Sequence, residues 1–482
     1  MAGWTSSLPG YPEALQASRK RGRAFGSGPF SRLRPNKNSN PVTHPAELAL
    51  TVVTIPHMRP FRFIHAADLH IGSPFVGLRV EAGDEVADRL QGATYQAFDN
   101  LIDLCVEENV DFLLVAGDVY DGDNRLPRDQ IYFWNGMRRL VEAGIQSFIV
   151  HGNHDHLGGR YSSMNWPDGV HVFEDPDMEP AWKVATRDDT PLADIRGVSY
   201  TQQHVDVNLA ARFGTARNSD LFSIGLLHCN VGEVEGHGNY APCSIEELLD
   251  MGFDYWALGH IHKKQSLGRG STLVEYPGNI QGRDVGELDE KGCLLVEVDS
   301  DGRAGIHFRP LDVIRWKIRD VPTAEITTLD GLLTELQGVV EELRSNSDGR
   351  DTIARLRLTG RSNLSQFIRD SGGLEMLAEE LNPATFTSSQ WVWIESIENL
   401  TRPPIDIEAM SKRDDFVGQL LNDAAKADSA DFEDALAGVF SGRYARRSGP
   451  LTPPDAAQIN EWINEARWYL AEQFIDSEPS ER

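Results

Sequence analysis

The sequence predicts a layered α/β domain, followed by a small α+β domain and a helical C-terminal region. In the first part, short apolar runs alternate with longer stretches whose apolar residues recur at helical spacing. Strand–helix alternation of this kind favours a sheet with helices on its faces. The second part alternates apolar and polar residues, and the third holds helical patterns after a Pro-rich linker. We place the three parts at residues 61–312, 313–400 and 401–482.

Five apolar runs are the expected strands of the first domain. Between the first two runs, Leu90, Thr94, Ala97 and Leu101 lie three or four residues apart, which predicts an amphipathic helix. Gly292–Val298 is expected to close the domain as a further strand. The five runs are Phe63–Ala67, Phe112–Ala116, Phe148–Val150, Phe222–Leu227 and Tyr255–Leu258.

The second and third parts show shorter patterns. Ile314 and Trp316 alternate with polar residues, which predicts a strand, and a helix is expected over Leu329–Leu343. In the C-terminal region, a helical pattern places Ile459 and Trp462 on one apolar face. This face either packs on its own domain or docks on a partner coiled coil.

The composition limits the classes of function. The 482 residues include 46 Lys and Arg against 73 Asp and Glu, a net charge of −27. This charge argues against a sequence-reading nucleic-acid module, which normally presents a basic face. It does not argue against an enzyme that meets phosphate through bound metal ions, because a cation reverses the local field. No apolar run approaches the roughly 18 residues of a membrane-spanning helix, so no membrane association is expected.

Residues 1–60 differ from the rest, with eight Lys and Arg but two Asp and Glu. We interpret them as a disordered basic tail or as a mis-assigned start, with translation beginning at Met58. A transit peptide and a DNA-binding arm are further alternatives. The four cysteines lie far apart and form no Cys-x-x-Cys pair, which predicts reduced thiols and a cytoplasmic location.

Each of the five apolar runs leads into a side chain that could bind a metal ion. Because the carboxyl ends of strands in an open α/β sheet are where ligands bind, these side chains can converge on one crevice. Two Asp, one Asn and four His without a thiolate suit Mn²⁺, Fe or Zn²⁺. Seven ligands are too many for one ion and suit two ions that share a carboxylate. The seven residues are Asp68, His70, Asp118, Asn153, His228, His260 and His262.

The motifs Asp-x-His, Gly-Asp-x-x-Asp, Gly-Asn-His-Asp, a single His and Gly-His-x-His follow one another in this order. The series resembles the calcineurin-like metallophosphoesterase superfamily. The context Phe63–Ser73 is similar to the SbcD-type DNA repair exonucleases, and Gly236–Pro242 and Tyr276–Arg283 are similar to the YhaO-type branch. The resemblance implies a four-layer α/β/β/α sandwich for residues 61–312.

The resemblance also implies how the ligands divide between two divalent ions, with Mn²⁺ the expected metal. Asp118 would bridge the two ions. The first ion would be held by Asp68, His70, Asp118 and His262, and the second by Asp118, Asn153, His228 and His260.

His154 follows a predicted ligand and therefore lies near the phosphate. It is the candidate for stabilising the transition state or protonating the leaving oxygen. Asp155 either orients the ring of His154 or caps a helix. Asp121 either tunes a metal-ligating histidine or serves the turn after Asp118. The candidate substrate contacts, for which an ordinary loop or surface role is the alternative, are His237, Tyr240, Asn279 and Arg283.

The leading hypothesis is a metal-dependent phosphodiesterase that acts on DNA ends, a repair exonuclease or endonuclease. The sequence has no Gly-Lys-Ser/Thr P-loop, so ATP-driven remodelling would come from another chain. The resemblance implies an SMC-like ATPase as that partner, docked on the C-terminal helices, with residues 313–400 as a DNA-facing cap. A homodimer is compatible with this hypothesis. Arginines of the cap that could contact phosphate are Arg350, Arg355, Arg357 and Arg361.

Two other classes of function remain open. A metallophosphoesterase for a small nucleotide or a phosphoprotein would have the same site chemistry, so only the surroundings of the site distinguish it. A scaffold with an inactive metal site is the third alternative, and metal analysis of the purified protein would test it.

Overall fold

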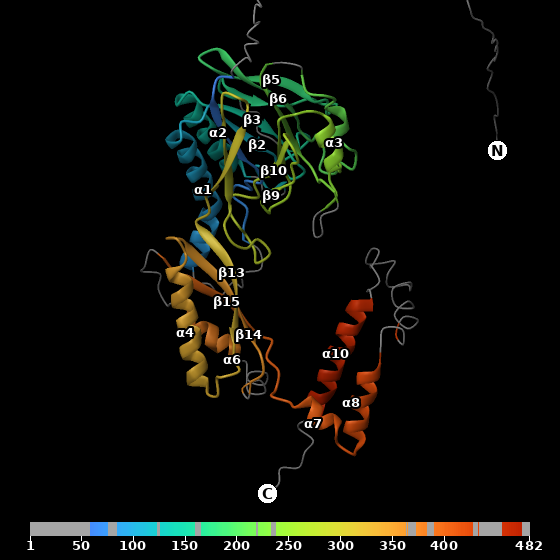
Figure 1. Ribbon diagram of the computed structural model, residues 1–482. Helices are drawn as coiled ribbons and strands as arrows, with labels where there is room; N and C mark the ends of the chain where they lie inside the picture. The colour runs from blue at the N-terminus through green and yellow to red at the C-terminus, as the bar shows by residue number, and fades with distance from the viewer. Residues whose placement is uncertain are drawn as a thin grey trace, which may run out of the picture. The chain divides into compact units, whose positions relative to one another are not determined.

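Two six-stranded sheets form the core of the first domain (Figure 1). The structure is a computed structural model, and most of the basic segment expected at residues 1–60 lies outside the residues it describes, as does the candidate substrate contact His237. The described residues are 58–75, 84–122, 126–159, 165–217, 220–232, 238–362, 364, 373–382, 390–427, 432 and 456–474.

The first sheet has the strand order β12-β11-β1-β2-β3-β4. Strands β1 to β4 run parallel, whereas β11 and β12 are antiparallel to their neighbours. Parallel neighbours need crossover connections, and helices α1 and α2 lie within two of them. The elements are β1 (Phe61–Ala66), α1 (Asp84–Glu107), β2 (Phe112–Ala116), α2 (Pro127–Glu142), β3 (Gln146–Val150), β4 (Val170–Val172), β11 (Gly292–Val298) and β12 (Ala304–Pro310).

The second sheet has the strand order β5-β6-β7-β8-β10-β9. Its four inner strands run parallel, and the two edge strands are antiparallel to their neighbours. The elements are β5 (Ala181–Arg187), β6 (Thr190–Val198), η2 (Ala210–Arg212), β7 (Phe222–His228), α3 (Ile245–Asp250), β8 (Tyr255–Gly259), β9 (Gln265–Ser266) and β10 (Leu273–Tyr276).

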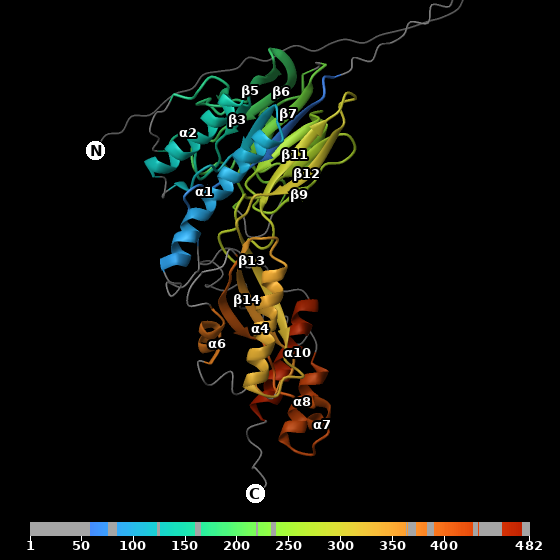
Figure 2. The same cartoon turned by 90° about the vertical axis from the view of Figure 1, so that its left-hand side faces the viewer.

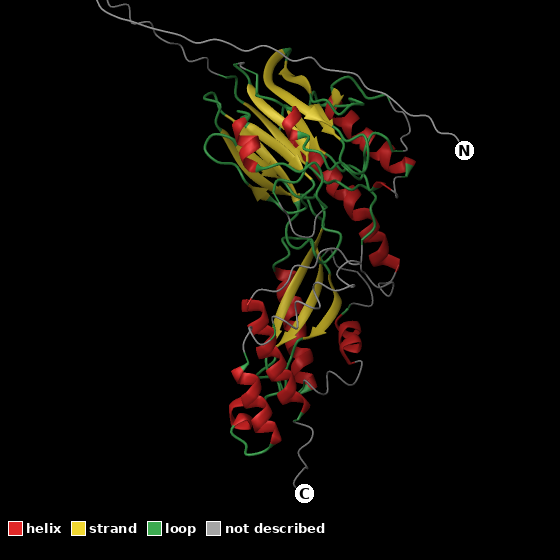
Figure 3. Cartoon of the chain, turned by 90° about the vertical axis from the view of Figure 1, so that its right-hand side faces the viewer, coloured by secondary structure: helices red, strands yellow, loops and turns green. Residues whose placement is uncertain are grey.

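Buried side chains pack on both faces of each sheet, because successive residues of a strand point to opposite faces. In β2, Phe112 and Leu114 pack against the second sheet, whereas Leu113 and Val115 pack against α1 and α2. In β8, Trp256 packs toward α3. Figure 1 shows α1 and α2 on one side of the paired sheets and α3 on the other, and Figure 3 shows the same layers by secondary structure. These four layers confirm the predicted α/β/β/α class.

The second domain is a three-stranded parallel sheet with the order β13-β14-β15. In β14, Ala354 and Leu356 pack in a cluster with α4 and α6, whereas Ile353 packs on the other face with Trp316. Figure 2 shows both helices beside this sheet. The elements are β13 (Ile314–Pro322), α4 (Leu329–Ser345), β14 (Asp351–Thr359), α6 (Gly373–Leu381) and β15 (Val392–Asn399).

Among its described residues, the C-terminal region has three helices that bury a small apolar cluster, which includes Leu421 and Ala471. Ile459 of the predicted apolar face is buried, but Trp462 of the same face is 47% exposed. In the part of the chain that the structure describes, no helix has the length and apolar character needed to cross a membrane. The elements are α7 (Ile407–Ser411), α8 (Phe416–Lys426) and α10 (Ala456–Gln473).

Phe63 tests the packing between the two sheets. It is completely buried, with its ring centroid 5.0 Å from that of Phe112 and 5.3 Å from that of Tyr255. We expect Phe63→Ala to lower the free energy of unfolding by about 3–5 kcal/mol, because it leaves a cavity between the sheets. Urea unfolding followed by tryptophan fluorescence measures the change. Val184→Ala, at an exposed position of β5, is the control and should change it by less than about 0.5 kcal/mol. Equal losses in both variants would contradict the assigned core.

Candidate metal centre

The seven predicted ligands lie at or just beyond the carboxyl ends of five strands, β1, β2, β3, β7 and β8. Six of them are buried and His262 is half-buried. In the described part of the chain, two groups of acidic and histidine side chains come close enough to hold a metal ion, and both consist of these predicted residues. The side chains at these strand ends therefore come together, as the sequence predicts.

Four predicted ligands have an unusual backbone conformation. The φ angles are 52° at Asp68, 44° at His70, 52° at Asp118 and 100° at His260. Positive φ in a residue other than glycine costs about 1–3 kcal/mol and persists where the surroundings enforce it. Here the N–H of Asp68 donates to the carbonyl of Gly117 and the N–H of His70 to that of Asp118, both at 3.1 Å. The loops after β1 and β2 therefore hold each other in the strained form.

The first group consists of Asp68, His70 and His262, whose donor atoms lie within 4.8 Å of one another. His70 Nε2 and His262 Nε2 are 3.2 Å apart. Two nitrogens that each lie about 2.1 Å from a shared ion are about 3.0–3.4 Å apart. The observed spacing therefore fits two neighbouring ligands of one ion.

The second group consists of Asp68, Asp118 and His228, again within 4.8 Å. His228 Nε2 lies 3.4 Å from Asp118 Oδ2 and 3.0 Å from Asn153 Oδ1. The ring of His260 lies beside that of His228, with centroids 5.2 Å apart. Asp68 belongs to both groups. The assignment of Asp118 as the bridging ligand stays a prediction.

Oxygen atoms around the two groups determine which nitrogen of each histidine can bind an ion. His228 Nδ1 and His260 Nε2 each face a backbone carbonyl at 2.9 Å. His262 Nδ1 faces Glu287 Oε1 at 2.6 Å. Because carbonyl and carboxylate oxygens only accept, these nitrogens donate, so the other nitrogen of each ring is the one that can bind an ion once the ring is neutral. Metal-ligating histidines have this arrangement in general.

Buried negative charge dominates the electrostatics of the site. Burial raises the pKa of Asp68 to about 6, although the charges of His262 and His228 oppose the shift. Burial alone would lower the pKa of His228, but the carboxylates of Asp118 and Asp68 raise it to about 9. Buried carboxylates of this kind are normally paired or bound to metal. The oxygen and nitrogen donors without a thiolate fit divalent ions such as Mn²⁺, Fe²⁺ or Zn²⁺.

His154 lies beside the first group, with its ring centroid 5.2 Å from that of His70. Its Nδ1 lies 2.8 Å from Asp121 Oδ1, and its side chain is 40% exposed. The hydrogen bond to Asp121 raises the pKa of His154, against the effect of burial. Asp121 thus holds the ring of His154, a role that differs from both sequence interpretations. The second Asp of the Gly-Asp-x-x-Asp motif was the signal for it.

Asp155 is fully buried and has other partners. Its Oδ2 lies 2.9 Å from His151 Nδ1 and accepts from the N–H of Val119 at 3.0 Å, and its Oδ1 accepts from the N–H of Gly152 at 2.7 Å. The role of Asp155 in orienting His154 therefore stays a prediction. Its carboxylate ties the loop after β2 to the loop after β3.

The predicted substrate contacts have different environments. The ring of Tyr240 lies 5.4 Å from that of His260, at the edge of the second group. Arg283 Nη2 lies 3.5 Å from Glu287 Oε1. Asn279 is fully buried, and its Nδ2 donates to Glu287 Oε2 at 2.9 Å. Its expected role as a substrate contact is therefore wrong, because its amide faces a carboxylate inside the protein.

Glu287 is a residue of the site that the sequence did not reveal. Burial would raise its pKa, but the hydrogen bond from His262 and the charge of Arg283 lower it to about 2. The side chain is therefore an anion beside the first group of ligands. No short motif marks this residue, and only the folded loop brings it to His262.

Comparisons with known proteins place the chain in a family. Residues 61–264 match the model of the calcineurin-like phosphoesterases, and residues 316–402 match that of the middle domain of metallophosphoesterase YhaO. Over 402 residues the chain is 33% identical to the "Uncharacterized metallophosphoesterase YhaO" of Bacillus subtilis, an alignment that covers 83% of this chain and 95% of that protein. The chain is a calcineurin-like metallophosphoesterase of the YhaO family.

More distant relatives match about half of the chain. The chain is 25% identical over 257 residues to the DNA double-strand break repair protein Mre11 of Sulfurisphaera tokodaii, covering 51% of this chain and 61% of that protein. It is 26% identical over 251 residues to a subunit of the SbcCD nuclease of Bacillus subtilis, covering 45% and 61%. Among solved structures, a dimetal phosphatase from Danio rerio matches 52% of this chain and 100% of its own length, with 13% identity and a TM-score of 0.32. The metallophosphoesterase match contains all seven predicted ligands.

Asp118→Ala tests the metal site. We expect this variant to bind less Mn²⁺ than the wild type, because it removes a carboxylate 3.4 Å from His228 Nε2. Elemental analysis after loading with Mn²⁺ and desalting measures the number of bound ions. Asp103→Ala, on the exposed surface of α1, is the matched control and should load like the wild type. Full loading of Asp118→Ala would contradict the assignment of this ligand.

Asp155→Asn tests the role of the one carboxylate in the Asn-His-Asp sequence. The new amide would turn its NH₂ group toward at least one buried donor, which costs roughly 1–3 kcal/mol for each unsatisfied group. We therefore expect a lower thermal midpoint for the metal-free protein, measured by circular dichroism. A variant as stable as the wild type would show that Asp155 does not tie the two loops together.

Proposed function

We propose that this metallophosphoesterase is a two-metal phosphodiesterase that hydrolyses DNA ends, the nuclease subunit of a repair complex. The proposal is supported by the names of its more distant relatives, a double-strand break repair protein and a component of a nuclease. The expected cofactors are two divalent ions. Mn²⁺ is the metal that we expect, and Fe or Zn²⁺ is the alternative. Such ions, when bound, supply a water molecule of lowered pKa and neutralise charge on the phosphate oxygens.

The observation that carries the chemistry of the proposal is the contact between Asp121 and His154. Asp121 occupies Nδ1 of the ring, so Nε2 is the nitrogen that can exchange a proton with a substrate. A half-exposed imidazolium at this position can protonate the leaving oxygen of a phosphodiester. DNA needs this proton, because the departing deoxyribose oxygen is a poor leaving group as an alkoxide.

The proposed partner is an SMC-like ATPase that binds the C-terminal helices. Three large apolar side chains on these helices are exposed: Phe416 by 68%, Trp462 by 47% and Tyr469 by 62%. Exposed aromatic side chains are enriched at protein interfaces. A coiled coil of the ATPase is the partner that we propose for this surface.

The arginines of the second domain are less suited to phosphate than the sequence suggested. Arg355 pairs with Glu395 and Glu398, and Arg357 pairs with Asp320. Arg350 pairs with Asp312, and Arg361 donates to the carbonyl of Pro403 and stacks over Trp468. These contacts engage the side chains that were expected to face DNA. We therefore place the main phosphate contacts at the metal centre.

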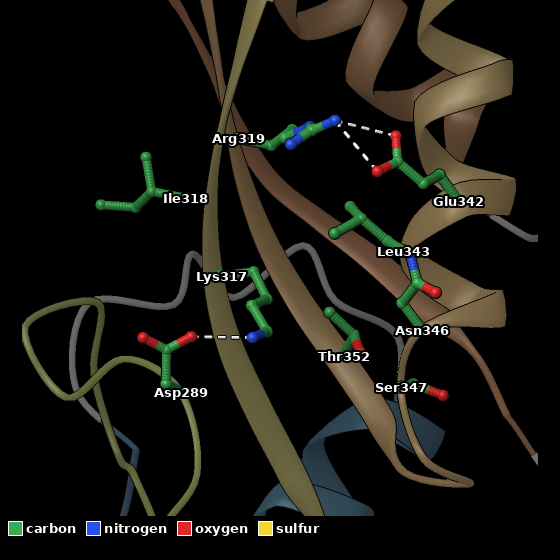
Figure 4. Close-up of a pocket in the computed structure, with 9 residues that line it drawn as sticks. All are labelled: Asp289, Lys317, Ile318, Arg319, Glu342, Leu343, Asn346, Ser347 and Thr352. Atoms are coloured by element: carbon green, nitrogen blue, oxygen red, sulfur yellow. Dashed lines mark hydrogen bonds and ion pairs between the residues drawn. The ribbon is translucent and has the colours of Figure 1, made fainter.

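A pocket of about 300 Å³ on β13 and α4 shows the same pattern. Figure 4 shows Lys317 directed toward Asp289, and Arg319 directed toward Glu342. Both cations of this pocket are paired, so the pocket offers no free positive charge to a phosphate.

We also propose a cytoplasmic location, because the four cysteines are free thiols.

The proposal predicts that Mn²⁺-loaded protein releases nucleotides from labelled linear duplex DNA. His154→Ala should keep its ions and lose about 10²–10⁴-fold in rate on DNA. The same variant should lose much less on bis(p-nitrophenyl) phosphate, because p-nitrophenolate leaves without a proton. His307→Ala, at an exposed position of β12, is the control and should behave like the wild type on both substrates.

Two outcomes would contradict the proposal. Rapid hydrolysis of cyclic nucleotides with DNA left intact would favour a phosphoesterase for small substrates. Loss of metal from His154→Ala would show that His154 is a ligand and not the proton donor.

A further inference from the structure

Glu287 lies in the loop between β10 and β11, residues 277–291, and reaches the first group of ligands. We propose that Glu287 is a positioning residue: it holds His262 as a metal ligand and, through Arg283, ties it to the carboxylate that holds His154. This proposal rests on the metal centre of the proposed function. It concerns how the ligands are held and not which phosphoester is cleaved.

The carboxylate of Glu287 is held from several directions. Its Oε1 lies 2.6 Å from His262 Nδ1. Its Oε2 accepts from Asn279 Nδ2 at 2.9 Å and from the N–H of Arg283 at 2.7 Å. Only 10% of the side chain is exposed. A carboxylate with these partners has one orientation, so it holds the His262 ring in one orientation as well.

The two histidines of the first group differ in their support. His70 Nε2 faces His262 Nε2 at 3.2 Å, but His70 Nδ1 is buried and has no hydrogen-bond partner among the described residues. The carboxylate of Glu287 therefore orients this pair of rings through its bond with His262 Nδ1. Partners of this kind fix the tautomer of a metal-ligating histidine and raise its basicity.

Arg283 connects the two functional histidines through their carboxylates. Its Nη2 lies 3.5 Å from Glu287 Oε1 and its Nη1 lies 3.7 Å from Asp121 Oδ2. Asp121 in turn holds His154 Nδ1. One guanidinium therefore lies between the carboxylate of the proposed proton donor and the carboxylate of a metal ligand. The side chain of Arg283 is 13% exposed, so little solvent reaches these charges.

Glu287→Gln tests the proposal with a minimal change of shape. An amide cannot accept from all the donors around Glu287, because its nitrogen must face at least one of them. We expect metal-free Glu287→Gln to bind Mn²⁺ about 10–100-fold more weakly at one of the two sites, measured by isothermal titration calorimetry. Glu275→Gln is the matched control: Glu275 is also buried, lies on β10 and accepts from Ser266 Oγ at 2.7 Å. Wild-type Mn²⁺ affinity in Glu287→Gln would overturn the proposal.

A measurement on the wild type keeps the proposal testable if the variant fails to fold. Nitrogen-15 NMR of the metal-free protein should show the proton of His262 on Nδ1, where Glu287 accepts it. A proton on Nε2 instead would overturn the proposal. The result is independent of the substrate: a wild type that leaves DNA intact but shows both effects refutes the nuclease hypothesis and retains the role of Glu287.

Discussion

The burial of two carboxylates at the strand ends is the constraint on which the rest of the first domain depends. Asp68 and Asp118 are 1% exposed, and a buried carboxylate is costly unless hydrogen bonds and a positive charge compensate it. The protein supplies part of the compensation: the N–H of His260 donates to both oxygens of Asp68 at 3.1 Å, and the N–H of His154 donates to Asp118 at 2.9 Å. The imidazoles of His228 and His262 add positive charge when protonated, and each has a nitrogen that can bind an ion when the ring is neutral. Divalent cations would supply the remaining positive charge, and the buried donor atoms could hold them.

The layered architecture makes this arrangement possible. Strands buried on both faces are rigid, and a rigid strand can hold the residues beyond its end in a strained conformation. Glycines provide the close approach that the ligands need: a Cβ on Gly152 would meet Asp118 Oδ1 at 2.3 Å, and a Cβ on Gly259 would meet the carbonyl of Ala116 at 1.9 Å. The crowding around the ligands therefore requires glycine at these two positions.

The convergence of the candidate ligands could be predicted from the sequence because each lies at or near the end of an apolar run, and the ends of parallel strands meet in space. The layered α/β class of the first domain was predicted for a similar reason, from local periodicity. The roles of residues that act through a contact between two loops could not be predicted from the sequence. Asp121, Asp155 and Glu287 bond to residues 33, 36 and 25 positions away. A polar residue of a loop has the same sequence pattern whether it faces solvent or another buried polar group. Asn279 was misread for this reason.

The most direct test of the metal centre is anomalous diffraction from crystals soaked in Mn²⁺. Two bound ions should give two peaks a few ångströms apart, one among Asp68, His70 and His262 and the other among Asp118, Asn153 and His228, with Glu287 still on the Nδ1 side of His262. A single peak elsewhere, or ligand side chains that remain in place with no anomalous density between them, would contradict the claim that these buried carboxylates exist to hold two ions.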